Sequence, residues 1–164
     1  MPLVPFLQMP DDARLWVFGA AAPVDAPDAA KLLAVVEAYL LQWKAHGHPL
    51  TCAHDWREER FLAIAVDQRT EGASGCSIDG LFRALQGHEQ ALGTSVVVGG
   101  LVFFRDSLGL VHAVKRDEFE KLAAAGDVTA TSPVFDTTIT TVGGYRSGFE
   151  RPAGQAWHAA FLRT

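Results

Sequence analysis

The order of the apolar segments restricts the fold of this chain more than any other feature. A β-prone apolar run at residues 15–18 comes first, and a stretch with apolar residues at helical spacing follows it. Two extended runs at residues 51–56 and 61–66 are separated by polar residues, which predicts a hairpin. A second helical stripe comes next. The two stripes consist of Leu32, Val36, Tyr39, Leu40 and Trp43, and of Ile78, Leu81, Phe82, Leu85 and Leu92.

Residues that favour helix ends stand at the limits of both stripes. Asp25 is a suitable N-cap for the first helix, and Pro27 suits its first turn. Gly47 and Pro49 are expected to stop this helix. Gly93 follows the second stripe, where a C-cap glycine belongs. The sequence therefore predicts two amphipathic helices, each lying between strands.

The segment after the second helix completes a known supersecondary pattern. Residues 95–98 and 101–104 predict a further strand, which gives residues 14–104 the βαββαβ order of a ferredoxin-like α+β fold. We expect a four-stranded antiparallel sheet there, with both helices on one face. Residues 1–13 are expected to form an irregular N-terminal arm and residues 105–164 an extension, all within a single domain.

The extension is expected to add strands and a short helix to this core. Turn residues at 106–109 and a helix stop at Gly126 bound these elements, which we expect at residues 110–114, 116–125, 133–135 and 137–142. In the last of these segments threonines alternate with Ile139 and Val142, as on a half-exposed strand. Such a strand can pair with a second copy, so a homodimer is one expectation. Trp157 and His158 are interpreted as an aromatic anchor for the C-terminal tail.

Composition excludes several classes of function. The chain has 164 residues, of which 49% are hydrophobic, enough for one buried core. A net charge of -5 gives no general attraction for nucleic acid or anionic lipid. The apolar runs are far shorter than the roughly 20 residues that span a bilayer, and the proline-containing N-terminus lacks the features of a secretory signal. The chain has 2 cysteines, too few for a disulfide framework, which favours a reducing compartment, so the cytoplasm is the expected location.

Four segments, spread over nearly the whole chain, carry a resemblance to known sequences. They are Gln42-Trp43-Lys44-Ala45-His46-Gly47, Val66-Asp67, Ala73-Ser74-Gly75-Cys76-Ser77-Ile78-Asp79 and Trp157-His158-Ala159. Together they resemble a family of small, uncharacterised bacterial proteins. Some members of that family carry the label of an ABC transporter ATPase, which would imply a glycine-rich phosphate loop ending in Gly-Lys-Ser/Thr. This sequence has no such loop, so the resemblance implies no activity and we expect no ATP hydrolysis.

Cys76 is the residue with the greatest chemical potential. It stands at the predicted start of the second helix, where free backbone N–H groups and the helix dipole favour a thiolate. Asp79 lies three residues further on, and its carboxylate either opposes the thiolate or caps the first turn. The alternative is a small buried cysteine that packs the helix against the sheet.

A ferredoxin-like topology would bring further reactive groups to the end of the sheet where Cys76 lies. These are His46, His48, Cys52 and Asp67. They are compatible with a metal site or with a Cys–His nucleophile pair oriented by Asp67, although neither spacing is standard. The simpler explanation is that the histidines are solvated at a helix end and that Cys52 is a strand residue facing the core. His54 lies on the strand face of Cys52, as a core or groove residue. No zinc and no cofactor is expected, because close thiol pairs are absent from the sequence.

The sequence is therefore compatible with two functions. The first is a non-catalytic binding or interaction module for a protein or a small molecule, since ferredoxin-like folds have many such roles. The second is a thiol-dependent enzyme or redox protein with Cys76 as nucleophile, one of His46, His48 or His54 as base, and Asp79 occupied in capping. The sequence leaves open whether the protein is an enzyme.

Overall fold

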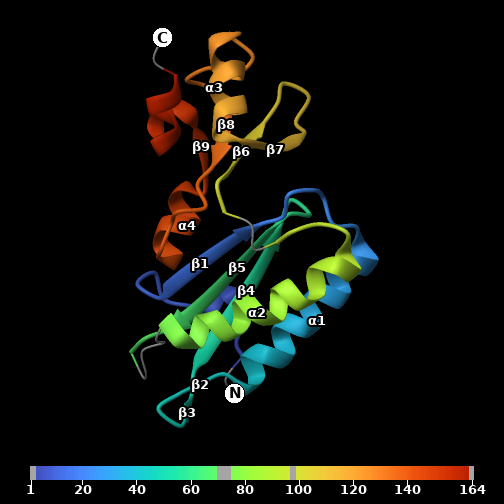
Figure 1. The fold of residues 1–164 in the computed structure, drawn as a ribbon. Coiled ribbons are helices and arrows are strands. Elements are labelled where there is room, and N and C mark those ends of the chain that lie inside the picture. The colour runs from blue at the N-terminus through green and yellow to red at the C-terminus, as the bar shows by residue number, and fades with distance from the viewer. Residues whose placement is uncertain (1–2, 70–74, 97–98, 163–164) are drawn as a thin grey trace.

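The computed structural model of this protein describes residues 3–69, 75–96 and 99–162, and within these ranges the side chains of Ala45 and of residues 75–77 are not described. The first part contains η1 (Phe6–Gln8), β1 (Arg14–Gly19), α1 (Ala26–Gln42), β2 (Lys44–Ala45), β3 (His48–Pro49), β4 (Thr51–Arg57), β5 (Phe61–Asp67) and α2 (Gly75–Leu92). The second part contains β6 (Leu101–Arg105), β7 (Val111–Lys115), α3 (Arg116–Ala124), β8 (Pro133–Phe135), α4 (Val142–Gly148), β9 (Glu150–Pro152), η2 (Ala153–Gln155) and η3 (Trp157–Phe161). The fold is mixed α+β, with antiparallel sheets (Figure 1).

Helix α1 begins where the sequence indicates but ends at Gln42, before the expected stop at Gly47 and Pro49. Residues 44–49 form the β2–β3 hairpin instead, and Gly47 takes the left-handed conformation of its turn, with a φ of +81°. The Asp25 carboxylate accepts a hydrogen bond from the Asp28 N–H at 2.9 Å, and a proline lies in the first turn of α1. Gly93 follows α2 with a φ of +68°, the left-handed conformation of a C-cap glycine. The predicted N-cap and C-cap are confirmed.

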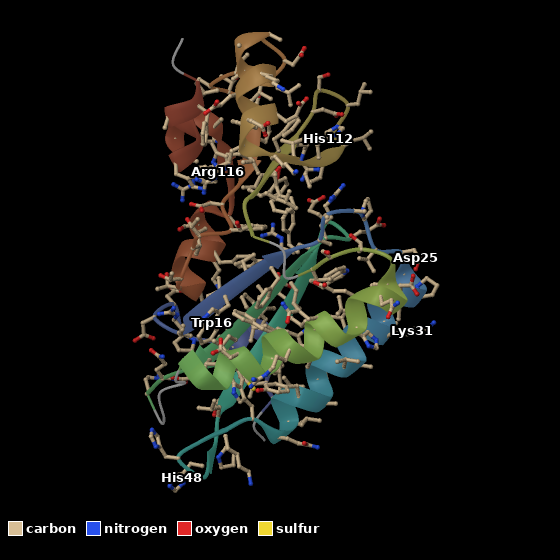
Figure 2. The ribbon with its side chains drawn as sticks, viewed as in Figure 1. Trp16, Asp25, Lys31, His48, His112 and Arg116 are labelled. Atoms are coloured by element: carbon tan, nitrogen blue, oxygen red, sulfur yellow. The ribbon has the colours of Figure 1, made fainter. Side chains whose placement is uncertain are left out.

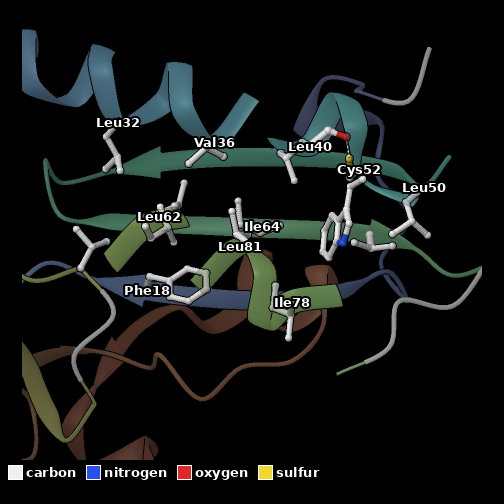
Figure 3. Close-up of a cluster of buried hydrophobic side chains, with 14 residues drawn as sticks. Phe18, Leu32, Val36, Leu40, Leu50, Cys52, Leu62, Ile64, Ile78 and Leu81 are labelled. Atoms are coloured by element: carbon white, nitrogen blue, oxygen red, sulfur yellow. Dashed lines mark hydrogen bonds between the residues drawn. The ribbon is translucent and has the colours of Figure 1, made fainter. Parts of the chain in front are cut away.

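Strands β1, β5 and β4 form an antiparallel sheet in that spatial order, and α1 and α2 cover one of its faces (Figure 1). The central strand, β5, is buried along its whole length. Because side chains alternate across a strand, Leu62 and Ile64 face the helices, where Leu32 and Leu81 meet them (Figure 3). Phe61 points to the opposite face. Both faces of the sheet therefore have to be covered. Helices α1 and α2 cover one face, and the second part of the chain covers the other.

Strand β6 does not join this sheet. It pairs with β7 and β8, in a second antiparallel sheet of order β7-β6-β8-β9. The four-stranded sheet predicted for residues 14–104 is not formed, and the ferredoxin-like arrangement is not confirmed. Two effects favour the observed pairing. The turn to β7 is short, so closing that hairpin costs little entropy, and Phe104 is buried against Phe119 of α3 in a separate core.

The two sheets share an aromatic core around Phe61. Its ring lies 4.9 Å from Phe103 of β6, 4.8 Å from Phe135 of β8 and 5.0 Å from Phe149, measured between centroids. Aromatic pairs at such distances contribute beyond their buried area, roughly 0.5–1.5 kcal/mol each. Phe61 therefore links the first sheet to the second through direct packing.

Residues 137–142 do not form the predicted strand. Thr141 is instead the N-cap of α4, and its hydroxyl accepts a hydrogen bond from the Gly144 N–H at 3.1 Å. The neighbouring Thr140 carbonyl accepts the Leu15 N–H at 2.9 Å, so this segment lies against the edge of β1. Threonine is both a good strand residue and a good N-cap, which explains the misassignment. The expectation of a homodimer depended on this strand, and the part of the chain that the structure describes does not contain it.

The C-terminal tail packs onto the second sheet. Trp157 and Phe161 of η3 lie against the core formed by Phe104, Phe119 and Val134. His158 is fully buried in the same region. The aromatic anchor predicted for the tail is confirmed. Among the helices in the described part of the chain, none is long and apolar enough to cross a membrane.

Candidate functional site

The backbone of Cys76 lies in the first turn of α2, where the sequence predicts it. Its side chain is not among those described, so its exposure and its neighbours stay predictions. Asp79 lies one turn further along α2 with an exposed side chain, and it forms no hydrogen bond with a described side chain. The capping role predicted for Asp79 thus finds no partner in the described part of the helix.

The three histidines proposed as bases lie in different surroundings. His46 and His48 are exposed on the small β2–β3 hairpin, where His46 has a φ of +52°. His54 of β4 is bound instead to Glu37 of α1, with Nε2 2.9 Å from Oε1. Its Nδ1 is buried and has no partner among the described residues. His54 is therefore a link between helix and sheet.

Cys52 and Asp67 are also accounted for by structural contacts. Cys52 is fully buried, and its Sγ lies 3.6 Å from the Leu40 carbonyl oxygen (Figure 3). Burial raises the pKa of the Cys52 thiol to about 12, so it stays protonated at neutral pH. Asp67 accepts hydrogen bonds from the Arg69 guanidinium, which hold the pKa of this carboxyl below its usual value. In the part of the chain that the structure describes, no three His, Cys, Asp or Glu side chains cluster as a metal site would require.

A pocket of about 610 Å³ opens at the other end of the molecule, on the second sheet beside α3. His112, which lines this pocket, and His48 lie at opposite ends in Figure 2. Three segments contribute to its wall: the β6–β7 hairpin, the exposed side of α3, and the loop before β8. The lining residues are Phe104, Arg105, Asp106, Ser107, His112, Val114, Glu118, Leu122, Asp127, Thr129, Ser132 and Pro133.

Asp106 organises the hairpin side of the pocket. Its Oδ1 accepts hydrogen bonds from the N–H groups of Leu108 and Leu110, at 2.8 Å and 3.0 Å, across the turn between β6 and β7. Gly109 takes the left-handed conformation that this turn requires, with a φ of +87°. The other oxygen, Oδ2, lies 2.6 Å from Nε2 of His112. These bonds fix the position of the carboxylate before any ligand arrives.

His112 is held on two sides and remains 44% exposed. It stands opposite Phe104 in the β6–β7 register, and the two rings are stacked at 5.1 Å with 20° between their planes. The hydrogen bond from His112 lowers the pKa of Asp106, so this carboxyl is ionised at neutral pH and accepts the proton of Nε2. A neutral His112 ring then has Nδ1 as its acceptor.

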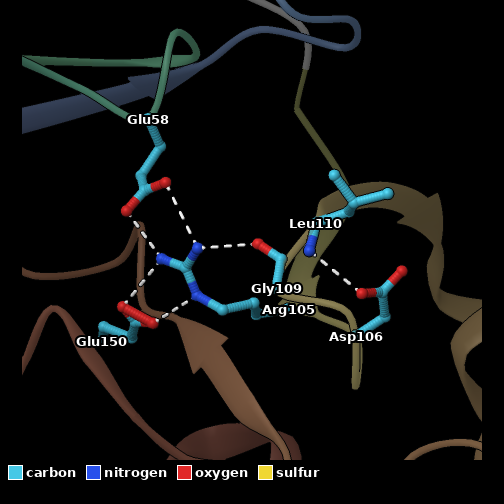
Figure 4. Close-up of polar contacts among 6 residues, drawn as sticks. All are labelled: Glu58, Arg105, Asp106, Gly109, Leu110 and Glu150. Carbon is cyan, nitrogen blue, oxygen red and sulfur yellow. Dashed lines mark hydrogen bonds and ion pairs between the residues drawn. The ribbon is translucent and has the colours of Figure 1, made fainter.

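The lining of the pocket is predominantly acidic. Asp106, Glu118 and Asp127 contribute carboxylates, whereas Arg105 is the guanidinium among the lining residues. Arg105 is already bound by two glutamates outside the pocket, Glu58 at 2.6 Å and Glu150 at 2.8 Å (Figure 4). Glu118 and Asp127 form no ion pair with any residue that the structure describes. The uncompensated charge in the pocket is therefore negative.

Sequence reasoning missed this pocket because each of its segments has an ordinary explanation. Residues 106–109 read as a turn and residues 116–125 as a solvated helix. One signal was available. Asp106 and His112 flank the turn with even spacing, and in a hairpin closed between residues 106 and 110 this puts both on one face of the sheet.

Comparison of the chain with protein-family models, with curated proteins and with solved structures gives no match. The resemblance to small bacterial proteins noted in the sequence therefore stays an expectation.

Proposed function

We propose that this protein is a non-catalytic binding module whose ligand is a small molecule held in the pocket between the second sheet and α3. The observation that carries this proposal is the pocket itself. Its volume, about 610 Å³, falls in the range of about 300–1,000 Å³ that is usual for ligand sites. Its wall combines apolar side chains, such as Val114 and Leu122, with a few polar groups that can orient a ligand.

The hydrogen bonds around the pocket favour binding over catalysis. A nucleophile needs a base within hydrogen-bond reach. Within the part of the chain described, no hydroxyl or thiol is hydrogen-bonded to His112, whose Nε2 is occupied by Asp106. The Ser132 hydroxyl accepts the Thr129 N–H at 2.9 Å and serves the loop. The polar groups are thus positioned by the protein, as recognition requires.

A thiol-dependent activity at Cys76 is the second candidate. One observation favours it: the backbone of Cys76 lies in the first turn of α2, a helix that continues to Leu92. In the first turn of a helix, free N–H groups and the helix dipole stabilise a thiolate. The proposed bases weaken it, because His54 is bound to Glu37 and His46 and His48 lie exposed on a separate hairpin. The binding module is therefore the preferred function.

A fragment screen by nuclear magnetic resonance tests the binding proposal. Uniformly ¹⁵N-labelled protein is titrated with small aromatic and aliphatic fragments of positive, neutral and negative charge. We expect saturable shifts of the backbone amides of Ser107, Val114 and Leu122, which line the pocket. Residues of the β2–β3 hairpin, at the other end of the molecule, should not respond.

A matched pair of variants locates the binding. Ser107→Trp places an indole on the wall of the pocket, whereas Leu108→Trp places it one residue further along the same turn, at a side chain that is 84% exposed and does not line the pocket. Binding should be lost in the first variant and kept in the second. Shifts centred elsewhere, or equal binding by both variants, would reject the pocket as the site.

A further inference from the structure

On the premise of the proposed function, we infer that the ligand of this pocket is a small organic cation that carries a flat apolar group. Two properties of the wall indicate such a ligand: the sign of its uncompensated charge, and the stacked pair of rings on its sheet side.

The charge of the wall selects a cation. Asp106, Glu118 and Asp127 stand in three different segments of the lining, so its acidic residues are distributed over the wall instead of occupying one segment. The Arg105 guanidinium cannot balance them, because Glu58 and Glu150 already bind it from outside. An anion would meet repulsion from several directions, whereas a cation would interact with at least one carboxylate wherever it is seated.

The spacing of the carboxylates selects an organic cation over a metal ion. Hard metal ions need several oxygen ligands at about 2–2.6 Å from one point. No group of three His, Cys, Asp or Glu side chains in the described ranges meets that condition. Asp106 also has its oxygens occupied by two N–H groups and by His112. An ammonium or guanidinium group on a molecule that fills the cavity can reach Glu118 or Asp127 without this convergence.

The ring pair selects a flat apolar group. Phe104 covers one face of the His112 imidazole, and the His112 side chain is still 44% exposed where it lines the pocket. A third flat ring, from the ligand, can extend this stack, and aromatic contacts of this kind contribute roughly 0.5–1.5 kcal/mol. Val114, Leu122 and Pro133 add apolar surface to the same wall. The combined site thus fits an arylalkyl ammonium compound.

Three probes of similar shape and different charge test this inference: benzylammonium, benzyl alcohol and benzoate. Each is titrated into the ¹⁵N-labelled full chain at neutral pH. We expect benzylammonium to bind at the pocket at least about threefold more tightly than benzyl alcohol, with no saturable shift from benzoate. Raising the ionic strength from about 0.02 M to about 0.5 M should remove most of this preference, because exposed charges are screened.

Variants assign the preference to the two unpaired carboxylates. In Glu118→Gln/Asp127→Asn we expect benzylammonium and benzyl alcohol to bind equally. Glu120→Gln is the matched control, since Glu120 is exposed on the same helix and does not line the pocket. Equal binding of all three probes to the parent would overturn the cation inference and leave the binding module in place. Absence of pocket shifts with these probes and with every fragment of the screen would overturn both.

Discussion

Nη2 of Arg105 lies 2.6 Å from Oε1 of Glu58, and this ion pair joins the second sheet to the β4–β5 turn of the first. Arg105 also binds Glu150 at 2.8 Å and stands over the ring of Phe135 at 5.3 Å. Its side chain is 23% exposed, so the pairs are only partly screened by water. One guanidinium therefore holds three segments of the chain together.

Replacing Arg105 with methionine should lower the free energy of unfolding by about 1–2 kcal/mol. The variant keeps an apolar stem over Phe135 but leaves Glu58 and Glu150 as neighbouring carboxylates without their cation. Urea unfolding followed by circular dichroism measures the change. Arg116→Met is the control, because Arg116 stands over Trp157 without an ion pair to any described carboxylate. A loss no larger than that of the control would contradict the role assigned to Arg105.

Glycine in place of Glu59 should raise the free energy of unfolding by about 0.5–1 kcal/mol. Glu58 and Glu59 both have positive φ, +59° and +57°, in the tight β4–β5 turn. This left-handed conformation costs free energy for any residue that has a Cβ, and glycine has none. The Glu59 side chain is exposed, so little contact is lost. Glu120→Gly, in the regular α3 helix, should instead lose about 1 kcal/mol. A Glu59→Gly variant less stable than the parent would argue against strain at this turn.

Alkylation should distinguish the two cysteines. Cys52 is fully buried with a pKa raised by burial to about 12, so iodoacetamide should leave it unmodified in the folded protein at pH 8. If the first N–H groups of α2 surround the Cys76 sulfur, as the second hypothesis requires, Cys76 should react faster than Cys52. Its pKa should then lie below the roughly 8.5 of a free thiol. Mass spectrometry of the parent, Cys52→Ser and Cys76→Ser assigns each modification. A Cys76 unmodified at pH 9 in the folded Cys52→Ser variant would make the thiol enzyme untenable.

Elements defined by local rules were predictable from the sequence. The α1 stripe, its Asp25 cap and the hairpin of β4 and β5 depend on spacing and on nearby residues. The same holds for β7 and α3, which follow the turn that Asp106 caps. Local preference and tertiary structure agree in all these segments.

Pairing between distant segments was not predictable. The pattern of β6 is equally compatible with a place beside β1 or beside β8, and the choice depends on where Phe103 and Phe104 find partners. Phe103 meets Phe61 across the sheets, and Phe104 meets Phe119 of a helix that comes later in the chain. The pocket depends on the same choice, because its wall forms only when β6, β7 and α3 come together.

His158 is fully buried, and both of its ring nitrogens lack a partner among the described residues. Trp157 stacks on it at 4.0 Å and Phe119 approaches it edge-on at 5.8 Å. Burial lowers the pKa of His158 to about 4, although the carboxylate of Asp136 acts in the opposite direction. An unfolded chain binds the same proton near pH 6.5. Between about pH 7 and pH 4 the unfolded state binds this proton and the folded state does not, so the free energy of unfolding should fall as the pH drops. Below about pH 4 both states bind the proton, and His158 should cause no further loss of stability.

Phenylalanine at this position removes the titrating group and the two unsatisfied nitrogens while keeping a ring. We expect His158→Phe to be more stable than the parent by about 1 kcal/mol at pH 7 and by about 2–3 kcal/mol more at pH 4. Urea unfolding of both proteins at each pH gives the difference, in which the carboxylates common to both cancel. His158→Leu serves the same test if the phenyl ring is too large. A difference between His158→Phe and the parent that is constant from pH 7 to pH 4 would mean that the imidazole binds its proton equally well in the folded and unfolded states, and that its burial does not control its charge.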